Sequence, residues 1–441
     1  MKTPQIAIGS VLERPKELLR SLLEHPASLL LVPMIFGLVR LALLPVVWPT
    51  KSPAECISPP FEGCGFIFDE AHYVPAVRRM MSGEGSVNLE HPPLSKWLIM
   101  LGILMYGDNP YGWRVPMVVS SSLSIFIAGL LALRLSGSMR LALLAQAFLA
   151  TDVTFFVVGG IGILDPPAVL FMLLAAYLYA SGRRLLAGVS AGLMMLSKSS
   201  GILLIPTLLA LDAVHAYGRT KDLDVAVEAV RKGIWHFAVP ALMVFMIVIG
   251  VWDAQTGAFP TPLHHLEFML SYHSNLKYDN PLHVELPLSW IIPPITRQPS
   301  PYYVEVVSPP GYHPKAFWGV SSPLWWSVWL LIPIAYSVVK RERVHNPSPE
   351  VFALSWFAVN FGAFALLAYA LKRWTYLFYF LQVSPVIAAS LPAVLERNGL
   401  GRITVPLLAL QLLWFVMFFP LKPDWLLGLL ASLGLGEVPW I

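Results

Sequence analysis

The feature that most constrains the fold is a succession of apolar segments, many of them about 20 residues long, the length of helix that crosses a bilayer. They lie near residues 27–48, 94–107, 112–134, 139–163, 164–181, 184–197, 200–217, 233–253, 322–340, 350–371, 375–395 and 402–420. The chain is 56% hydrophobic and 13% charged, which excludes an ordinary soluble composition. The pattern predicts an all-α polytopic membrane protein with about 11–13 transmembrane helices, forming a single membrane-embedded domain over residues 1–441. The net charge of +4 is scattered, without the basic stripe of a nucleic-acid-binding protein.

Basic residues indicate the orientation of these segments, because cytoplasmic loops of membrane proteins are enriched in Lys and Arg. The residues that fall on one side are Lys2, Arg14, Lys16, Arg20, Arg183, Arg184, Arg219, Lys221, Arg231, Lys232, Lys340, Arg341, Arg343, Arg397 and Arg402. This register predicts a cytoplasmic N-terminus and two large outer loops, 49–93 and 254–321. Within it, segment 139–163 either crosses twice or re-enters, giving 13 or 11 helices.

The outer loop 49–93 is unusually rich in ionisable side chains. From residue 68 the chain reads FDEAHYVPAVRRMMSGEGSVNLEHPPLSKW. Ionisable residues beside broken membrane helices predict a functional site. The same loop holds both cysteines, Cys56 and Cys64, for which we predict a disulfide in an oxidising compartment, with two free thiols as the alternative.

Short motifs along the chain resemble those of one enzyme family. Asp69-Glu70-Ala71-His72-Tyr73 is similar to the D-E-x-H-[FY] motif of the protein O-mannosyltransferases, glycosyltransferase family 39. Further similarities follow in the family's order: EHPPLSK at 90–96, YGWRVP at 111–116, ILD at 163–165, LSKSSG at 196–201, YH at 272–273, SW at 289–290 and RWTYLFY at 373–379. Two features depart from the family pattern. His283 precedes Val284 instead of Pro, and loop 254–321 is too short for the luminal trefoil domain of eukaryotic members, which indicates a prokaryotic or archaeal type.

The resemblance implies a GT-C type fold and an inverting glycosyltransferase. Its expected donor is mannose on a dolichyl or other polyprenyl phosphate, and its expected acceptor is a Ser or Thr hydroxyl of a protein. Transfer is expected on the outer face of the cell membrane, by a chain that forms a dimer in some members of the family. The resemblance implies no metal cofactor. Residue types that suit zinc or manganese do occur in loop 254–321, namely His264, His265, Glu267, His273 and His283.

Asp69 is the predicted catalytic base, because it matches the family's catalytic aspartate and a neutral hydroxyl attacks poorly unless a carboxylate takes its proton. The alternative for Asp69 is an N-cap of the following helix. Glu70 is the next residue, and on a helix it points about 100° away. It is therefore expected to bind acceptor backbone, a sugar hydroxyl or a neighbouring helix.

The departing lipid phosphate gains negative charge and needs cationic partners, for which Lys198 and Arg373 are the candidates. The remaining predicted substrate-binding residues are Glu70, His72, His91, Lys96, Asp165, His273, Trp290 and Tyr376. Structural alternatives exist, such as a helix cap for Asp165 and an interfacial position for Trp290. Arg114 is expected on the cytoplasmic side, in a structural pair or as an anchor at the membrane interface.

Three other functions are compatible with the sequence. A different polyprenyl-phosphate-sugar transferase, for example one that moves aminoarabinose to lipid, would share the acidic first loop. A transporter would also need many helices, but the chain shows no internal repeat and its charges gather at one face. A catalytically inactive assembly partner would keep the fold.

Overall fold

The computed structural model describes residues 25–85, 87–294, 299–305, 315–341 and 346–434, and in this part of the chain the architecture is almost entirely helical. The helices are α2 (Leu31–Leu43), α3 (Glu70–Ser82), α4 (Leu94–Tyr106), α5 (Pro110–Ser136), α6 (Met139–Ala150), α7 (Val153–Val158), α8 (Asp165–Ala180), α9 (Arg184–Ser197), α10 (Leu204–Thr220), α11 (Leu223–Gly233), α12 (Val239–Thr256), α13 (Pro262–Asn275), α14 (Pro287–Trp290), α15 (Pro323–Trp326), α16 (Val328–Arg341), α17 (Pro349–Trp356), α18 (Gly362–Ala365), α19 (Ser384–Arg397), α20 (Thr404–Met417) and α21 (Asp424–Ser432). The described sheet is one antiparallel hairpin of β1 (Ser300–Glu305) and β2 (Lys315–Gly319).

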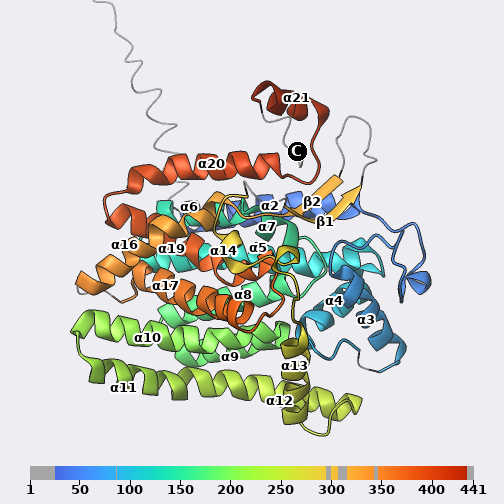
Figure 1. The fold of residues 1–441 in the computed structure, drawn as a ribbon, viewed down its shortest axis with the longest axis horizontal. Helices are drawn as coiled ribbons and strands as arrows, with labels where there is room; N and C mark the ends of the chain where they lie inside the picture. The colour runs from blue at the N-terminus through green and yellow to red at the C-terminus, as the bar shows by residue number, and fades with distance from the viewer. Residues whose placement is uncertain (1–24, 86, 295–298, 306–314, 342–345, 435–441) are drawn as a thin grey trace, which may run out of the picture.

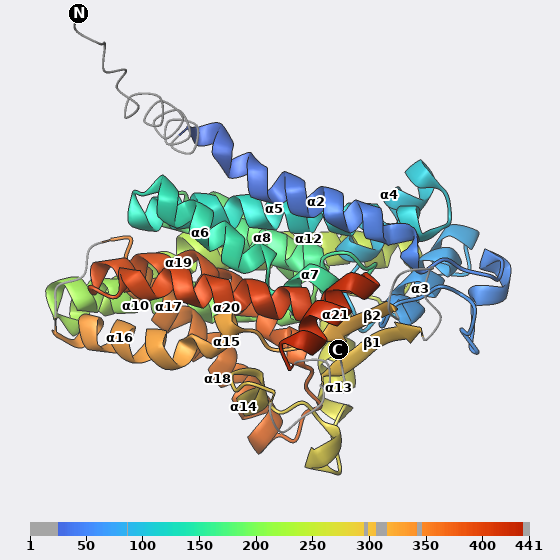
Figure 2. The same cartoon turned by 90° about the horizontal axis from the view of Figure 1, so that it is seen from above.

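The long helices run side by side as a bundle (Figures 1 and 2). Six helical stretches of the described chain are long and apolar enough to cross a membrane: Pro26–Val46, Pro110–Ser136, Ser199–Thr220, Leu223–Thr256, Pro323–Arg341 and Pro349–Ala370. Shorter apolar helices, among them α6, α8 and α9, accompany them. The predicted all-α polytopic membrane fold is confirmed.

Small side chains fill the centre of the bundle, where α5 and α8 lie beside α9 and α19. The fully buried alanines of these four helices include Ala128, Ala132, Ala175, Ala176, Ala187, Ala191, Ala388 and Ala389. Small residues allow helix backbones to approach closely, which is how packing is achieved in a membrane, where apolar burial alone does not drive helices together.

The two large loops meet at one end of the bundle, which we call the loop end. The backbone N–H of Phe68 in the first loop donates to the carbonyl of Tyr302 in the second, at 3.2 Å. A ring nitrogen of His273 lies 3.1 Å from the carbonyl of Glu90. The prediction that loops 49–93 and 254–321 share one face is therefore confirmed. In Figure 1 this end lies on the right.

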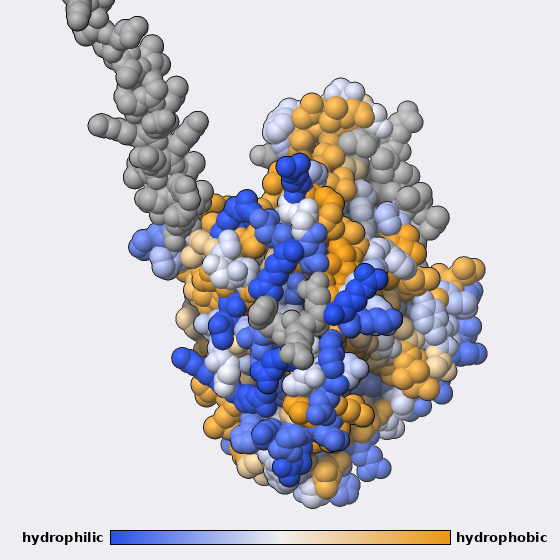
Figure 3. Space-filling model, turned by 90° about the vertical axis from the view of Figure 1, so that its left-hand side faces the viewer, coloured by the Kyte–Doolittle hydropathy of each residue, from blue (hydrophilic) through white to orange (hydrophobic). Residues whose placement is uncertain are grey.

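Basic residues gather at the opposite end. Arg397 donates to the carbonyl of Leu135 at 2.8 Å, Lys221 donates to that of Val339 at 2.8 Å, and Arg140 pairs with Glu396 at 3.0 Å. Figure 3 looks onto this end and shows many hydrophilic side chains on it. The basic residues of segment 1–24, and Arg343, lie outside the described residues.

Helix α4 does not cross the bundle, although its sequence predicted a membrane segment. Its first turn contacts the first loop through Lys96, and the turn that follows it stays at the same end, because Asp108 forms an ion pair with Arg78 of α3 at 2.9 Å. Thirteen residues of helix also span only about 20 Å, less than the hydrocarbon core. Helix α5 therefore starts at the loop end, and the prediction that Arg114 lies at the end opposite the two large loops is wrong.

This course of α4 also settles segment 139–163, which makes one broken passage and not a double or re-entrant one. Helix α6 starts at the basic end, and the chain after α7 reaches the loop end at Asp165. Asp152 lies at the break, where its carboxylate accepts from the N–H of Phe155 at 2.8 Å and from the hydroxyl of Ser322 at 3.0 Å. The indole of Trp325 donates to the same carboxylate. These contacts satisfy the polar groups that the interrupted helix exposes.

The predicted disulfide is present in the first loop. Cys56 and Cys64 are bonded, with their Cα atoms 5.7 Å apart, and both are buried. Arg78 of α3 donates to the carbonyl of Cys56 at 2.9 Å, so the disulfide-bonded segment is attached to the helix that follows the proposed catalytic residue.

Candidate active site

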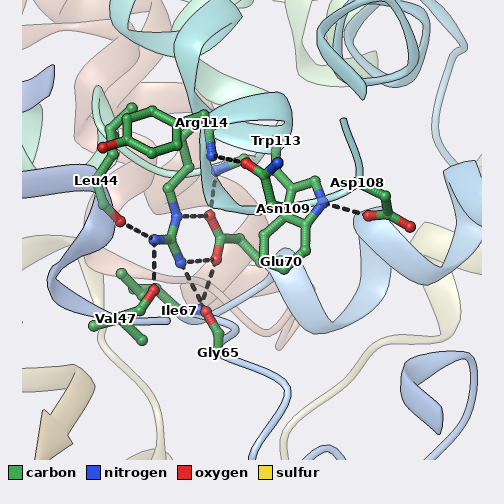
Figure 4. Close-up of polar contacts among 11 residues, drawn as sticks. Leu44, Val47, Gly65, Ile67, Glu70, Asp108, Asn109, Trp113 and Arg114 are labelled. Atoms are coloured by element: carbon green, nitrogen blue, oxygen red, sulfur yellow. Dashed lines mark hydrogen bonds and ion pairs between the residues drawn. The ribbon is translucent and has the colours of Figure 1, made fainter. Parts of the chain in front are cut away.

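A buried ion pair organises the loop end. Glu70 is the first residue of α3 and Arg114 lies in the second turn of α5. Their side chains form two parallel hydrogen bonds, each 2.8 Å, and both are almost inaccessible to solvent (Figure 4). Paired N–H···O bonds of this kind are among the strongest that side chains form.

Every polar atom of this pair has a partner. The remaining N–H groups of Arg114 donate to the carbonyls of Leu44 and Val47, at 2.8 and 3.1 Å, and to that of Gly65, at 2.8 Å. The carboxylate of Glu70 also accepts from two backbone N–H groups, Ile67 at 2.8 Å and Gly162 at 2.7 Å. Glu70 has no capacity left for a substrate. Its predicted substrate-binding role is therefore corrected, and of its expected partners the neighbouring helix is the one observed.

Asp69 lies immediately before α3, yet its carboxylate does not cap that helix in the described structure. Phe68 precedes it with a φ of 52°, a left-handed conformation that is rare for an aromatic residue and typical of functional sites. The ring of Phe68 stacks on Tyr302 with centroids 4.3 Å apart, which holds this conformation. The capping alternative is thus not observed, and the carboxylate is half-buried and available for chemistry.

Charged neighbours surround Asp69. Burial raises the pKa of its carboxyl to about 6; His72 opposes this increase, Asp165 adds to it and Lys198 opposes it. Lys198 itself pairs with Asp165 at 2.7 Å and lies 4.7 Å from the ring centroids of both Phe378 and Tyr379. The fold therefore brings together four predicted site residues from α3, α8 and the end of α9.

A second group of predicted residues adjoins the first. A ring nitrogen of His273 on α13 lies 3.2 Å from the hydroxyl of Ser199, and its other ring nitrogen lies 3.2 Å from the guanidinium of Arg373. The ring of His91 is 5.3 Å from that of His273. Burial lowers the pKa of His91 well below its usual value and that of His273 to about 4, so both rings are neutral at pH 7.

Tyr376 lies beside this group and is 38% exposed, with its ring 5.5 Å from that of Phe378. The chain reaches it through Arg373, whose backbone forms a β-bridge with Lys277 just after α13. The left-handed φ of 53° at Lys372 turns the chain at this point. Tyr376 and the exposed His72 are the site residues most accessible from outside.

Two predicted residues are held in structural contacts. The ammonium of Lys96 is buried and donates to the carbonyls of Asn88 and His91, at 2.6 and 2.9 Å. Trp290 is fully buried, packs against phenylalanine rings, and donates its indole N–H to the carbonyl of Glu285 at 3.0 Å. Neither side chain faces the group around Asp69.

Several contributors to the site were not identified from the sequence, chiefly Tyr302 and Ser199. Tyr302 comes from the β-hairpin, and no local sequence pattern predicts that this hairpin contacts the first loop. Ser199 follows Lys198 inside a motif that was noted, so position in the motif was an available signal. Of the candidate metal ligands, His264 bonds to Thr261 and His265 to Asp253. Among the described residues no three His, Cys, Asp or Glu side chains form a group that could hold a metal.

Comparisons with known proteins identify relatives of this chain. The family model described as dolichyl-phosphate-mannose-protein mannosyltransferase matches residues 90–252. A polyprenol-phosphate-mannose–protein mannosyltransferase of Corynebacterium glutamicum is 34% identical over 123 residues, which is 25% of this chain and 24% of that protein. The protein of the same name from Mycolicibacterium smegmatis is 22% identical over 473 residues, covering 85% of this chain and 86% of that protein.

A second group of relatives uses another sugar. An undecaprenyl phosphate-alpha-4-amino-4-deoxy-L-arabinose arabinosyl transferase of Pseudomonas aeruginosa is 30% identical over 177 residues, 36% of this chain and 32% of that protein. In structure, the chain is similar to ArnT from Cupriavidus metallidurans bound to undecaprenyl phosphate. The TM-score is 0.52 at 14% identity, over 93% of this chain and 73% of that one.

The chain therefore shares the fold of ArnT. In sequence, the chain is similar to the protein mannosyltransferases. The matched segment covers about a quarter of the Corynebacterium protein and most of the Mycolicibacterium protein.

Separating the buried ion pair should destabilise the protein. Replacing Glu70 by Gln or Arg114 by Met leaves an unpaired buried charge, which costs about 3–5 kcal/mol. We expect a clear fall in the unfolding temperature of the purified protein in detergent. Glu396→Gln, which removes the exposed partner of Arg140, is the matched control and should change little. An unchanged unfolding temperature for Glu70→Gln would contradict the structural role of the pair.

The pH dependence of transfer should report the environment of Asp69. Because burial raises its pKa to about 6, the carboxyl is protonated below pH 6 and cannot accept a proton there. On the acidic side of the pH–rate profile, we expect kcat/KM to be constant above pH 7 and to fall about tenfold per pH unit below pH 6. The measurement is kcat/KM across a buffer series with unfolding monitored in parallel. An acidic limb near the usual carboxyl pKa of about 4 would contradict the raised pKa of Asp69.

Proposed function

We propose that the chain is an inverting glycosyltransferase that moves mannose from a dolichyl or other polyprenyl phosphate to Ser or Thr hydroxyls of proteins. The observation that supports this most directly is the half-buried carboxylate of Asp69, which does not cap α3 and lies beside the Asp165–Lys198 pair. The same carboxylate lies in the motif that resembles the family's catalytic segment. The match of the mannosyltransferase family model to residues 90–252 supports the choice of sugar.

In the proposed reaction Asp69 acts as the general base. The acceptor oxygen forms a bond to the anomeric carbon of mannose, and its proton passes to Asp69 as that bond forms. The bond between the anomeric carbon and the phosphate oxygen breaks at the same time, and its electron pair leaves with the lipid phosphate. One displacement from the face opposite the leaving group inverts the anomeric configuration.

The leaving phosphate gains negative charge, which the cations of the site stabilise. Lys198 and Arg373 are the proposed partners, since one lies beside Asp165 near Asp69 and the other beside His273. The neutral ring of His91 can offer an N–H group on the same side, whereas the single N–H of His273 is directed at the carbonyl of Glu90. Two fixed cations and the ring N–H of His91 supply this stabilisation without a resident metal, so we propose that the enzyme needs none.

The remaining predicted substrate-binding residues lie near Asp69. We propose that Asp165, His72 and Tyr376 contact the sugar or the acceptor, because Asp165 and His72 lie close enough to influence the charge of Asp69 and the side chains of His72 and Tyr376 are exposed. The positive-inside register assigns the loop end to the outer face of the cell membrane and the N-terminus to the cytoplasm. The acceptor is then reached from water while the lipid chain of the donor lies against apolar helices. A dimer is part of the same proposal, on the basis of the family resemblance alone.

Asp69→Asn should abolish the base while keeping the shape of the side chain. We expect kcat to fall by about 100-fold or more, because a positioned base typically contributes 10²–10⁴-fold. Expression and unfolding temperature should stay near the wild-type values. Asp224→Asn, an exposed acid near the start of α11 at the opposite end, is the matched control. Full activity of Asp69→Asn would remove Asp69 from the mechanism.

A second candidate function is transfer of a different sugar to a lipid acceptor, which the 30% identity to the arabinosyl transferase over 177 residues favours. Purified protein supplied in turn with polyprenyl-phosphate mannose and with the aminoarabinose donor separates the two. We expect mannosylation of a Ser/Thr-containing peptide, unaffected by a metal chelator. Transfer from the aminoarabinose donor to a lipid acceptor alone would establish the second function instead, and loss of activity with the chelator would overturn the metal-free mechanism.

A further inference from the structure

The turn that carries Glu90 and His91 is held by side chains from outside it. All four carbonyls of residues 88–91 have a basic partner: Lys96 lies 2.6 Å from that of Asn88 and 2.9 Å from that of His91, while His265 lies 2.8 Å from that of Leu89 and His273 3.1 Å from that of Glu90. Two of these partners belong to α13 in the second loop. Asn88 has a left-handed φ of 57°, so the turn depends on such contacts to keep its shape.

The side chain of His265 is held by several contacts, although no function has so far been assigned to it. It is fully buried, and its ring stacks on Phe259 with centroids 4.4 Å apart. One ring nitrogen faces the carbonyl of Leu89 and the other faces a carboxylate oxygen of Asp253, both at 2.8 Å. Asp253 lies in the last turn of α12 and is also buried, and its second carboxylate oxygen has no hydrogen-bond partner among the described residues.

The chemistry of these contacts fixes the role of the ring. A carbonyl only accepts hydrogen bonds, so the nitrogen that faces Leu89 carries a proton. The other nitrogen faces a carboxylate, so a further proton is shared between the ring and Asp253. The carboxylate thus sets the orientation of a histidine that in turn donates to the backbone, as second-shell carboxylates do for metal-binding histidines.

We propose that His265, oriented by Asp253, is a positioning residue that holds the 88–91 turn and so places His91 in the donor subsite. The inference rests on the proposed function, because His91 adjoins His273 and Arg373, where the donor phosphate is assigned. Leu89 is two residues before His91, so a displaced carbonyl at Leu89 moves the His91 ring. Errors of about 1 Å in such a contact can cost up to about 100-fold in rate.

The test measures the KM for each substrate separately. For His265→Leu we expect the KM for polyprenyl-phosphate mannose to rise about tenfold, with the KM for the acceptor peptide unchanged. A role in folding alone would lower the yield of active protein and leave both KM values as they are. His265→Gln should recover most of the donor KM, because its amide N–H can still reach the carbonyl of Leu89. His264→Ala, which alters the exposed neighbouring side chain that bonds to Thr261, is the matched control.

Asp253 gives an independent route if His265→Leu does not fold. Asp253→Asn can still hydrogen-bond to the ring and should keep the wild-type donor KM, whereas Asp253→Leu should raise it as His265→Leu does. An unchanged donor KM in a folded His265→Leu or Asp253→Leu variant would overturn the proposal. Direct binding of dolichyl phosphate separates this result from failure of the proposed function. If wild type transfers no sugar yet binds this lipid, weaker binding by the variants still supports the positioning role and equal binding rejects it.

Discussion

The loop end depends on the buried pair of Glu70 and Arg114. Burying two charges is costly, and the cost is offset only where every hydrogen-bonding atom finds a partner. Here the five N–H groups of Arg114 and both oxygens of Glu70 are used, and their partners come from the end of α2, the first loop and the segment before α8. One interaction thereby joins segments that are far apart in the sequence. It also fixes the start of α3, where Asp69 lies.

The two adjacent acids therefore have opposite environments and different roles. Successive residues on a helix point about 100° apart, so one carboxylate faces the protein interior and the other the open side. Glu70 is paired with Arg114 and has a structural role. Asp69 is half-buried and near other charges, and its carboxylate does not cap α3. Its raised pKa of about 6 is suited to accepting a proton at neutral pH. The Asp165–Lys198 pair keeps a cation close to it without adding net charge.

The site is assembled by contacts between the two large loops, and the helices of the bundle support both. Tyr302 of the β-hairpin holds Phe68, and α13 holds the 88–91 turn through His265 and His273. Three of the residues that shape the site have left-handed backbones without being glycine: Phe68, Asn88 and Lys372. Such conformations persist only where surrounding contacts determine them, which is the case at each of these positions.

The sequence by itself determined the membrane class, the common face of the two loops, the disulfide and the residues that gather around Asp69, because hydropathy, basic-residue bias and short motifs are local properties. Only the tertiary structure decided that α4 stays at the loop end, that Glu70 is structural, and that Lys96 and Trp290 are turned away from the site. Hydropathy measures how apolar a segment is and not the path that the chain takes, so a short helix lying at one end resembles a crossing. A carboxylate's partner likewise depends on which residue the fold brings to it, and Arg114 lies 44 positions from Glu70 in the chain.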